Sequence, residues 1–512
     1  MSAVVLVREG CYQDSARLMQ VGREIAALPG VVEAVAMMGT GANRRLLYDA
    51  GFAGAALDRA TPMDMVVALR AEDEAALGRA REALDRALAG AGPGRVEDPS
   101  ERRPATVAEA IAADPAANLV SVAVPGPYAA FVAHRALDAG RSVFLFSDNV
   151  PLGDEVALKL RARDLGLLVM GPDCGTAILS GVGLGFANRV DRGPVGIVGG
   201  SGTGIQELCC ILDREGLGVS HAIGVGSRDL SEAVGGAMSE SGLALLAADP
   251  GTRCVALVAK HPAAAVAERL HGLLARLGKP AVVRTLGEPP RPSADGVLYA
   301  ASLDEAAELL SASVRGGGMA RSDDRATVRM RVGRPSKATE QRLVGLFGGG
   351  SLAAEARCVL AARGVSTSVP TERLVPGAPL PPGHLVVDTG DDAYTVGRPH
   401  PMVDQTVRCD LIRSAGSDPT VTVLLLDLVL GDGAHPDPAP ELIRAVEDAR
   451  TARDGRALAA VVSVCGSRRD PQGTQRQERL LQDAGFLVEP TAARAADAAA
   501  ALLLGIRKEV VR

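Results

Sequence analysis

The sequence is poor in the residues that mark several classes of protein. It has no tryptophan and only 2% aromatic residues, too few for the base-stacking platforms of proteins that bind single-stranded nucleic acid. Its net charge is −6, with acidic and basic residues interspersed. It therefore lacks the clustered basic residues that are typical of proteins that bind nucleic acid. The 8 cysteines include no pair with CxxC spacing, which favours reduced thiols in the cytoplasm.

Long apolar runs are missing as well. No basic region precedes a long apolar stretch near the N-terminus, so we expect no secretory signal. The most apolar late run, "VTVLLLDLVLG", is too short to span a bilayer and contains Asp427. We therefore expect a cytoplasmic protein with no nucleic-acid or membrane partner.

The chain instead shows a regular alternation of strand and helix patterns, and its 512 residues exceed one ordinary hydrophobic core. The first part alternates in a ferredoxin-like order and ends in a stretch rich in glycine, proline and charge. From Thr106, near-continuous apolar strands alternate with helices, as in parallel sheets covered on both faces. The predicted fold class is α/β, with several Rossmann-like or flavodoxin-like parallel-sheet domains and a small N-terminal α+β domain. We place the domains at residues 1–95, 104–188, 192–315 and 338–512.

One glycine-rich stretch, "PVGIVGGSGTGIQEL", joins a buried strand to a helix that starts near Thr203. Free backbone N–H groups at a helix N-terminus form an anion site, and glycine lets the anion come close. Ile205 stands where a dinucleotide motif needs its last glycine, and no lysine completes a P-loop. A single small anion therefore fits best, although a tight turn alone explains the same glycines. The candidate phosphate ligands are Gly200, Ser201, Gly202 and Thr203.

A second stretch, "GLFGGGSLAAEA", repeats the same order of apolar strand, glycines and helix in the last domain. Here the candidate phosphate ligands are Gly349, Gly350 and Ser351. The repeat predicts that two helix N-termini point at one common anion, although chance duplication would give the same pattern.

These motifs resemble succinyl-CoA synthetase. The region 106–310 resembles its alpha subunit, through "GPDCGTAI", "GPVGIVGGSGTGIQE" and "GVGSRDL", and the region 340–505 resembles the C-terminal ligase domain of its beta subunit. The fusion of both parts behind a small N-terminal domain resembles the FdrA family. This resemblance implies a CoA-binding-like domain at 104–188 and ligase-like domains at 192–315 and 338–512. It also implies that the two glycine turns cradle a phosphate group.

One departure from the resemblance bears on function. The synthetase family carries its phosphoryl group on a histidine in a "GHAGA" motif, whereas the corresponding stretch here, "GEPPRPSADGVLYA", has no histidine. No segment resembles the ATP-grasp domain of the beta subunit either. A ligation by the family route is therefore not favoured by the sequence.

FdrA-like proteins are linked to oxamate carbamoyltransferase, in allantoin breakdown. The resemblance then implies phosphorolysis of oxalurate to oxamate and carbamoyl phosphate, with phosphate as the nucleophile and no covalent enzyme intermediate. The partners would be phosphate, a small carbamoyl or carboxylate substrate, and additional protein subunits. Two alternatives stay open: an ADP-forming acyl-CoA synthetase or CoA-binding protein, with CoA as its cofactor, and a non-catalytic regulatory subunit.

Polar side chains near strand ends are candidates for the chemistry. Arg228 is a candidate catalytic residue, because a guanidinium fork can hold a carboxylate or phosphate; a loop salt bridge is the alternative. Arg398 and His400 lie in a proline-stiffened loop, "VGRPHPMVD". His400 could protonate the departing nitrogen and Arg398 could bind substrate, or both could simply lie on a surface loop.

A second group follows the strands of the last domain, where ligands sit in open α/β sheets. We expect His435 to be catalytic, and Asp432 and Asp437 to be able to bind Mg²⁺, although a turn rich in Gly, Asp and Pro needs no ligand. Arg468 could help to neutralise phosphate. Asp173 and Cys174, in the turn "GPDCGT", are further substrate-binding candidates, but a cysteine without an adjacent histidine is more typical of packing.

Overall fold

The computed structural model describes two compact units. One comprises residues 1–105 and 395–399, and the other residues 106–394 and 400–512. The predicted fold class is confirmed, because parallel sheets with helices between their strands follow a small antiparallel domain. The described residues are 2–11, 13, 15–26, 28–89, 104–316, 331–332, 341–395, 398–453 and 455–507.

The first unit is built on an antiparallel three-stranded sheet of order β1-β3-β2. Its central strand, Met65–Ala71, is buried along nearly its whole length, because it is paired on both edges and covered by helices. The other elements are β1 (Ser2–Arg8), α1 (Ser15–Ala26), β2 (Val31–Met38), α2 (Gly41–Asp49), α3 (Ala55–Arg59) and α4 (Glu74–Ala89).

The second unit begins with a parallel three-stranded sheet of order β4-β5-β6. Alanines on α6 are buried against it, which lets the helix approach closely. We refer to this part as the small Rossmann domain. Its elements are α5 (Val107–Ala113), β4 (Leu119–Val122), α6 (Gly126–Asp138), β5 (Ser142–Leu145), α7 (Leu152–Asp164) and β6 (Val169–Met170).

A seven-stranded sheet of order β13-β12-β11-β9-β10-β7-β8 follows. Its β9 to β13 are parallel, whereas the hairpin of β7 and β8 adds an antiparallel edge. The hairpin residues lie within the range 104–188 that we grouped with the preceding domain, yet they pair with this sheet. The elements are β7 (Thr176–Leu179), β8 (Val182–Gly185), β9 (Val195–Gly199), α8 (Gly202–Arg214), β10 (Val219–Gly224), α9 (Ala237–Ala248), β11 (Cys254–Lys260), α10 (Ala264–Ala275), β12 (Ala281–Leu286), β13 (Val297–Tyr299) and α11 (Leu303–Arg315).

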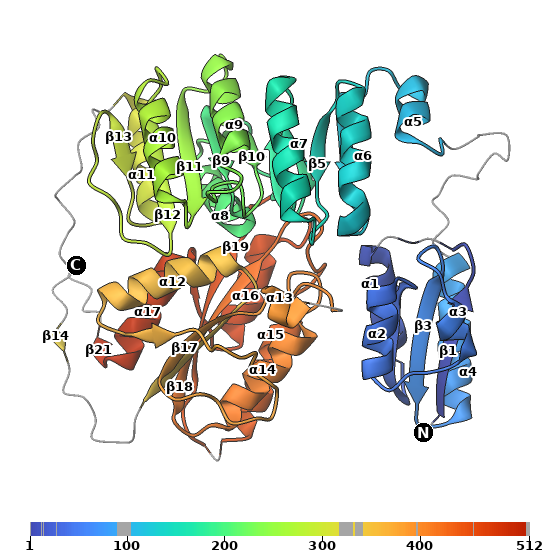
Figure 1. Cartoon of the computed structure of the whole chain (residues 1–512). Helices are drawn as coiled ribbons and strands as arrows, with labels where there is room; N and C mark the ends of the chain where they lie inside the picture. Colours follow the sequence, from blue (N-terminus) through green and yellow to red (C-terminus); the bar gives the residue numbers. More distant parts are fainter. Residues whose placement is uncertain are drawn as a thin grey trace. The chain divides into compact units, whose positions relative to one another are not determined.

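The last domain is a parallel six-stranded sheet of order β16-β17-β15-β18-β19-β20. Figure 1 shows α12 along the side of this domain that is nearest the seven-stranded domain. A short pair, β14 (Arg331–Val332) with β21 (Ile506–Arg507), lies outside the sheet. The elements are β15 (Arg342–Phe347), α12 (Gly350–Ala362), β16 (Thr367–Ser368), β17 (His384–Asp388), α13 (Asp392–Thr395), α14 (Thr406–Ser417), β18 (Val421–Val429), α15 (Ala439–Thr451), β19 (Ala459–Cys465), α16 (Thr474–Asp483), β20 (Leu487–Glu489) and α17 (Ala492–Leu503).

Both larger sheets place a glycine turn at the point where the strand order reverses. Strand β9 has β10 on one side and β11 on the other, and β15 has β17 on one side and β18 on the other. Ligands of open α/β sheets bind outside the carboxyl ends of the strands at such points. The two turns that stood out in the sequence therefore occupy equivalent places in two domains. Among the described residues, no helix is long and apolar enough to cross a membrane.

Candidate functional site

The first glycine turn follows β9 and opens α8. Ser201 caps this helix, because its Oγ accepts a hydrogen bond from the N–H of Gly204 at 3.1 Å. The neighbouring position 200 requires glycine, because a Cβ there would lie 2.9 Å from the carbonyl oxygen of Gly226. The N–H groups of Gly202 and Thr203 have no hydrogen-bond partner among the described residues. Two donors at the positive end of the helix dipole are therefore available to an anion.

The second glycine turn follows β15 and already holds an anion that belongs to the protein. The carboxylate of Asp427, on the adjacent strand β18, accepts from the N–H groups of Gly348 at 2.7 Å and Gly349 at 2.8 Å. Asp427 is fully buried and forms an ion pair of 2.9 Å with buried Arg408. These two turn donors are thus occupied, and the donors left for a ligand are those of the first turn of α12.

The two turns meet directly. The hydroxyl groups of Ser201 and Ser351 hydrogen-bond to each other, and both residues are buried. A Cβ on Gly349 would lie 3.1 Å from the Cβ of Thr203, so the turns approach as closely as glycine allows. Because the Ser201 Oγ already accepts from Gly204, its proton is free to donate. The predicted convergence of the two helix N-termini is present in the structure.

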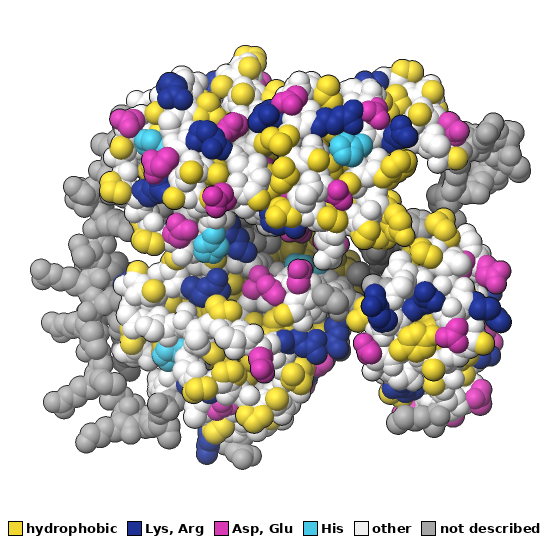
Figure 2. All heavy atoms as spheres, viewed as in Figure 1, with side chains coloured by type: hydrophobic (Ala, Val, Ile, Leu, Met, Phe, Trp, Pro, Cys, Tyr) yellow, Lys and Arg dark blue, Asp and Glu magenta, His cyan; other side chains and the backbone are white. Residues whose placement is uncertain are grey.

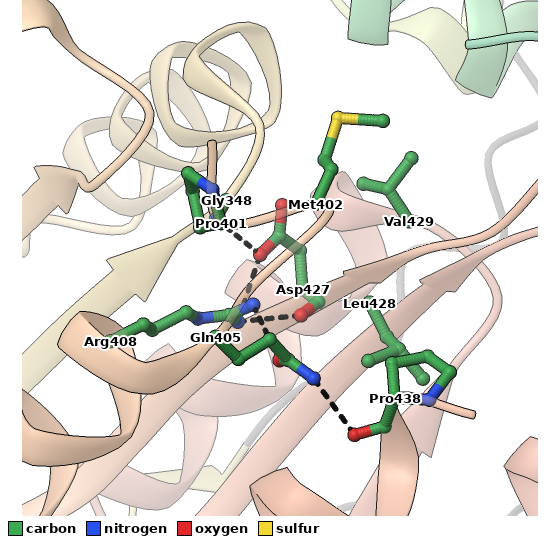
Figure 3. A pocket seen from close by; sticks show the side chains of 9 residues that line it. All are labelled: Gly348, Pro401, Met402, Gln405, Arg408, Asp427, Leu428, Val429 and Pro438. Atoms are coloured by element: carbon green, nitrogen blue, oxygen red, sulfur yellow. Dashed lines mark hydrogen bonds and ion pairs between the residues drawn. The ribbon is translucent and has the colours of Figure 1, made fainter. Parts of the chain in front are cut away.

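The space directly beneath the second turn is too small for a substrate. Figure 3 shows this cavity, with Arg408 and Gln405 on one side and Asp427 in the centre. Its volume is about 10 Å³, which is enough for about one water molecule. It is lined by Gly348, Pro401, Met402, Gln405, Arg408, Asp427, Leu428, Val429 and Pro438. A substrate would have to approach the turns from the other side.

Figure 2 shows a hollow between the six-stranded domain and the rest of the second unit, where acidic, basic and histidine side chains gather. Asp388 ends β17, accepts from the N–H of Gly390 at 2.8 Å, and lies so close to Gly350 that a side chain there would collide with it. From the facing part, Asp173 accepts from the hydroxyl of Ser227 at 3.2 Å. Desolvation raises the pKa of Asp388 and of Asp173 to about 6 in each case.

The two carboxyl groups differ in exposure but share their electrostatic surroundings. The Asp173 residue is exposed, whereas Asp388 is partly buried. The protein that surrounds Asp173 nevertheless desolvates its carboxyl group and raises its pKa. Lys260, at the end of β11, acts on both carboxyl groups and favours their charged forms. Sequence reasoning did not select Lys260 or Asp388. Their position as the last residues of parallel strands was the signal that could have identified them.

His400 lies beside the second turn. A Cβ on Gly390 would come within 2.5 Å of the His400 Nε2 and 2.9 Å of the Gly348 carbonyl oxygen. The Nδ1 of His400 accepts from the N–H of Met402 at 3.2 Å, which leaves the ring proton on Nε2. Its ring centroid is 6.3 Å from that of Phe186. Desolvation lowers the pKa of His400 to about 4, so the ring is neutral at physiological pH.

A further histidine reaches the segment that lacks one in the sequence. His261 follows Lys260, has a φ of 45°, and its Cε1 would lie 3.1 Å from a Cβ on Gly287. Its Nδ1 is 3.4 Å from the Glu288 carboxylate. A non-glycine residue at positive φ stores strain and often marks a functional site. The imidazole of His261, from the loop after β11, therefore lies beside Gly287, the first residue of the segment 287–300.

Two predicted residues are held by protein contacts. Arg228 donates to the carbonyl oxygen of Val150 at 2.7 Å and pairs with Glu155 at 2.8 Å. Glu155 also binds buried Lys159, which contacts Asp229 at 3.0 Å. This network connects the loop after β10 to α7. Arg228 therefore forms a salt bridge within the protein, which was the alternative to a role in substrate binding. Cys174 is buried, and desolvation raises its pKa to about 12, which suits packing and not nucleophilic attack.

The group after β18 is also engaged with the protein. His435 is buried; its Nδ1 accepts from the N–H of Asp437 at 3.0 Å and its Nε2 lies 3.2 Å from Glu441. Asp432 forms a fork with Arg189, and Asp437 a fork with Arg476. In the described part of the chain, no cluster of His, Cys, Asp and Glu could hold a metal ion. Catalysis by His435 and Mg²⁺ binding stay predictions, and both would require these partners to rearrange.

The two remaining candidates lie on exposed loops. Arg398 is exposed and belongs to the segment 395–399, which groups with the first unit, so it is not among the residues brought together here. Arg468 is exposed beyond β19. The neighbouring Arg469 is bound to Asp191 at 2.6 Å. The residues that the second unit does bring together are Ser201, Gly202, Thr203, Gly349, Gly350, Ser351, Asp173, Asp388, Lys260 and His400.

Comparison with known proteins defines the class. Residues 346–502 match the CoA-ligase family, and residues 1–104 match the family described as "AllF, heavy metal-associated domain". The chain is therefore a fusion that carries a CoA-ligase domain. Over 506 residues it is 36% identical to the uncharacterized protein YahF of Escherichia coli (strain K12), covering 95% of this chain and 96% of that protein. It belongs to the family of YahF.

More distant relatives are CoA ligases. The chain is 29% identical over 191 residues to the alpha 1 subunit of the ADP-forming succinate–CoA ligase of Archaeoglobus fulgidus, covering 36% of this chain and 64% of that protein. A solved structure titled dinucleotide-forming acetyl-coenzyme A synthetase 1 of Ca. Korarchaeum cryptofilum, in complex with phosphate and ADP, is 18% identical. It covers 76% of this chain and 82% of that chain, with a TM-score of 0.32. The match to the succinate–CoA ligase alpha subunit agrees with the resemblance that the sequence motifs indicated.

The name of the N-terminal family raises the question of a heavy-metal site in the first unit. Soft metals are bound through paired thiolate or imidazole ligands. Residues 1–104 contain one cysteine, Cys11, and no histidine. Asp64, the buried acidic residue nearby, accepts from the N–H groups of Gly10 and Thr61. The residues of this domain therefore do not fit a heavy-metal site.

Proposed function

We propose that this protein catalyses an acyl-transfer reaction of the CoA-ligase type, in which phosphate and an acyl group react where the two glycine turns meet. The observation that carries the proposal is the direct contact of Ser201 and Ser351, which brings the N-termini of α8 and α12 together. Two helix dipoles and the unpartnered N–H groups there supply charge stabilisation for a dianion. Membership of residues 346–502 in the CoA-ligase family supports this class of reaction.

The residues in the hollow would act on the acyl group. Lys260 supplies a cation for a substrate carboxylate. Asp388 and Asp173, with pKa values of about 6, can accept hydrogen bonds from substrate N–H groups or exchange a proton near neutral pH. The His400 Nε2–H donates beside the second turn. Holding phosphate and acyl carbon together would supply most of the rate.

Two acyl donors are compatible with this site. The first is an acyl-CoA, the kind of thioester that the name of the succinate–CoA ligases implies, and residues of this chain are similar to those ligases. In this reaction the phosphate oxygen attacks the thioester carbon, the C–S bond breaks, and an acyl phosphate and CoA thiol result.

The second donor is oxalurate, with additional subunits completing the enzyme. The phosphate oxygen attacks the carbamoyl carbon, the C–N bond breaks, and the nitrogen takes a proton to give oxamate and carbamoyl phosphate. The absence of a histidine within residues 287–300 is compatible with this candidate, because the reaction needs no phosphohistidine. Two carboxyl groups facing the reacting centre also suit an amide-rich substrate.

Both donors would yield an acyl phosphate, which hydroxylamine traps as a hydroxamate or as hydroxyurea. The full chain, with any subunits that co-purify, is incubated with phosphate and either succinyl-CoA or oxalurate. Mass spectrometry of the trapped product then identifies the donor. Product that depends on phosphate from one donor supports that assignment, and absence of trapped product from both rejects the proposed function.

A further inference from the structure

Two buried glutamates join the domains in a reciprocal way. Glu207 lies on α8 and Glu355 on α12, and each follows the first residue of its helix by the same interval: "GTGIQE" and "GSLAAE". Both side chains are buried, at 1% and 0% exposure. Each carboxyl group caps the N-terminus of a helix that belongs to the other domain.

The first cap runs from the seven-stranded to the six-stranded domain. The Glu207 Oε1 accepts from the N–H of Ala492, the first residue of α17, at 2.6 Å. Its Oε2 is buried and has no hydrogen-bond partner among the residues that the structure describes. Burial raises the pKa of Glu207 well above its usual range, and the acidic neighbours Asp304 and Glu355 raise it further. The raised pKa favours the neutral carboxylic acid, whose carbonyl oxygen would cap α17.

The second cap runs in the opposite direction. The Glu355 Oε1 accepts from the N–H of Leu303, the first residue of α11, at 2.7 Å. Its Oε2 binds the Arg284 guanidinium at 2.6 and 3.0 Å, and both side chains are buried. Burial raises the pKa of Glu355, yet the carboxyl stays ionised at neutral pH, because Arg284 would otherwise be a buried charge without a partner.

We propose that Glu207 and Glu355 are a reciprocal pair of positioning residues that hold the two glycine turns in register across the domain boundary. Each glutamate sits about 1.5 helical turns from its glycine turn and fixes α8 or α12 to the opposite domain. The caps are reinforced where α11 and α17 meet, since the Thr491 hydroxyl donates to Asp304 at 2.8 Å. The two glutamates thus hold Ser201 and Ser351 in contact before any ligand binds. That phosphate binds at this contact rests on the proposed function.

The two glutamates should respond differently to the same conservative change. Glu207→Gln keeps an amide oxygen for Ala492 and removes no charge, so it preserves the contact. Glu355→Gln leaves Arg284 without a counter-charge, so it should disturb the contact of Ser201 with Ser351. Glu207→Ala removes the first cap. Ala492→Pro breaks the same cap from the other side, because it removes the donor N–H and places the ring Cδ against the Glu207 Oε1; proline is tolerated at the first position of a helix and Thr491 is already extended.

The test is a cross-link that requires no ligand. Ser201→Cys with Ser351→Cys places two thiols where the hydroxyl groups touch, within reach of a disulfide. Oxidation is followed on non-reducing gels and mapped by mass spectrometry, well below each variant's melting temperature, with Ser201→Cys alone as the control. We expect the parent and the Glu207→Gln background to form the bond at the same rate. We expect Glu207→Ala, Ala492→Pro and Glu355→Gln to form it about tenfold more slowly, the loss of one buried hydrogen bond.

Equal rates in all folded backgrounds would overturn the proposal, because glutamates that only add stability lower the melting temperature without changing the native contact. Equal slowing by Glu207→Gln and Glu207→Ala would overturn the neutral cap. Titration of the chains with native serines by inorganic phosphate separates the two proposals. Cross-linking as expected without phosphate binding by the parent would refute the proposed function alone.

Discussion

The hydroxyl groups of Ser201 and Ser351, 150 positions apart in the sequence, hydrogen-bond to each other where two helices begin. One helix follows β9, the central strand of the seven-stranded sheet, and the other follows β15, one of the two middle strands of the six-stranded sheet. Each of the two sheets thus presents a glycine turn to the other, and the N-termini of two helices meet at one place. The following predictions test what this place binds and what holds it together.

Gly202→Val should remove anion binding without unfolding the protein. A Cβ at Gly202 would have only the Thr176 hydroxyl near it, at 3.4 Å, so the variant tests access to the backbone and not packing. We expect the affinity for inorganic phosphate, measured by calorimetry, to fall at least about tenfold, because the side chain blocks close approach. Gly153→Ala, in the first turn of α7 with open space around it, is the matched control. Unchanged affinity in Gly202→Val would mean that this turn holds no anion.

Asp427→Asn should strongly destabilise the second unit. The carboxylate satisfies two turn N–H groups and pairs with buried Arg408, so its loss leaves a charge buried without a partner. We expect a loss of about 3 kcal/mol in the free energy of unfolding, measured by urea denaturation. The control is Asp432→Asn, which breaks the exposed pair with Arg189 and should have no measurable effect. A small effect of Asp427→Asn would show that the turn does not depend on this carboxylate.

Anion binding should weaken as pH rises through about 6. Asp388 and Asp173 are neutral below their pKa values of about 6 and negatively charged above them, so repulsion of an anion grows as protons leave. With sulfate, which does not titrate near neutral pH, we expect a roughly five- to tenfold weaker affinity at high pH than at low pH. Asp388→Asn should flatten this dependence. If the variant and the parent share one pH profile, Asp388 does not face the bound anion.

His400 should remain neutral across the physiological range. Its pKa of about 4 results from desolvation, and the accepting Nδ1 fixes the proton on Nε2. In NMR spectra of histidine-labelled protein, its resonance should not shift between about pH 5.5 and pH 8. His400→Asn identifies the resonance by its loss. A midpoint near the ordinary histidine pKa would show that the ring is solvated and would remove its proposed role as a neutral donor.

The sequence predicted the fold class and the meeting of the turns, because strand and helix periodicity and glycine spacing are local signals. It did not reveal that Asp427 occupies the N–H groups of Gly348 and Gly349, since the two segments become neighbours only when β18 pairs with β15. Similarly, Arg228 looked like a free guanidinium until the structure brought Glu155 to it. Side chains chosen from loops were the least reliable, because their partners come from distant segments.

We propose that both glycine turns hold one phosphate. The most direct measurement is an experimental structure of the full chain with arsenate, a phosphate analogue whose anomalous scattering marks its position. We expect a single peak within hydrogen-bonding distance of the backbone N–H of Thr203 in α8 and of the backbone N–H groups in the first turn of α12. An anion bound to one turn only, or none at either turn at saturating arsenate, would contradict it.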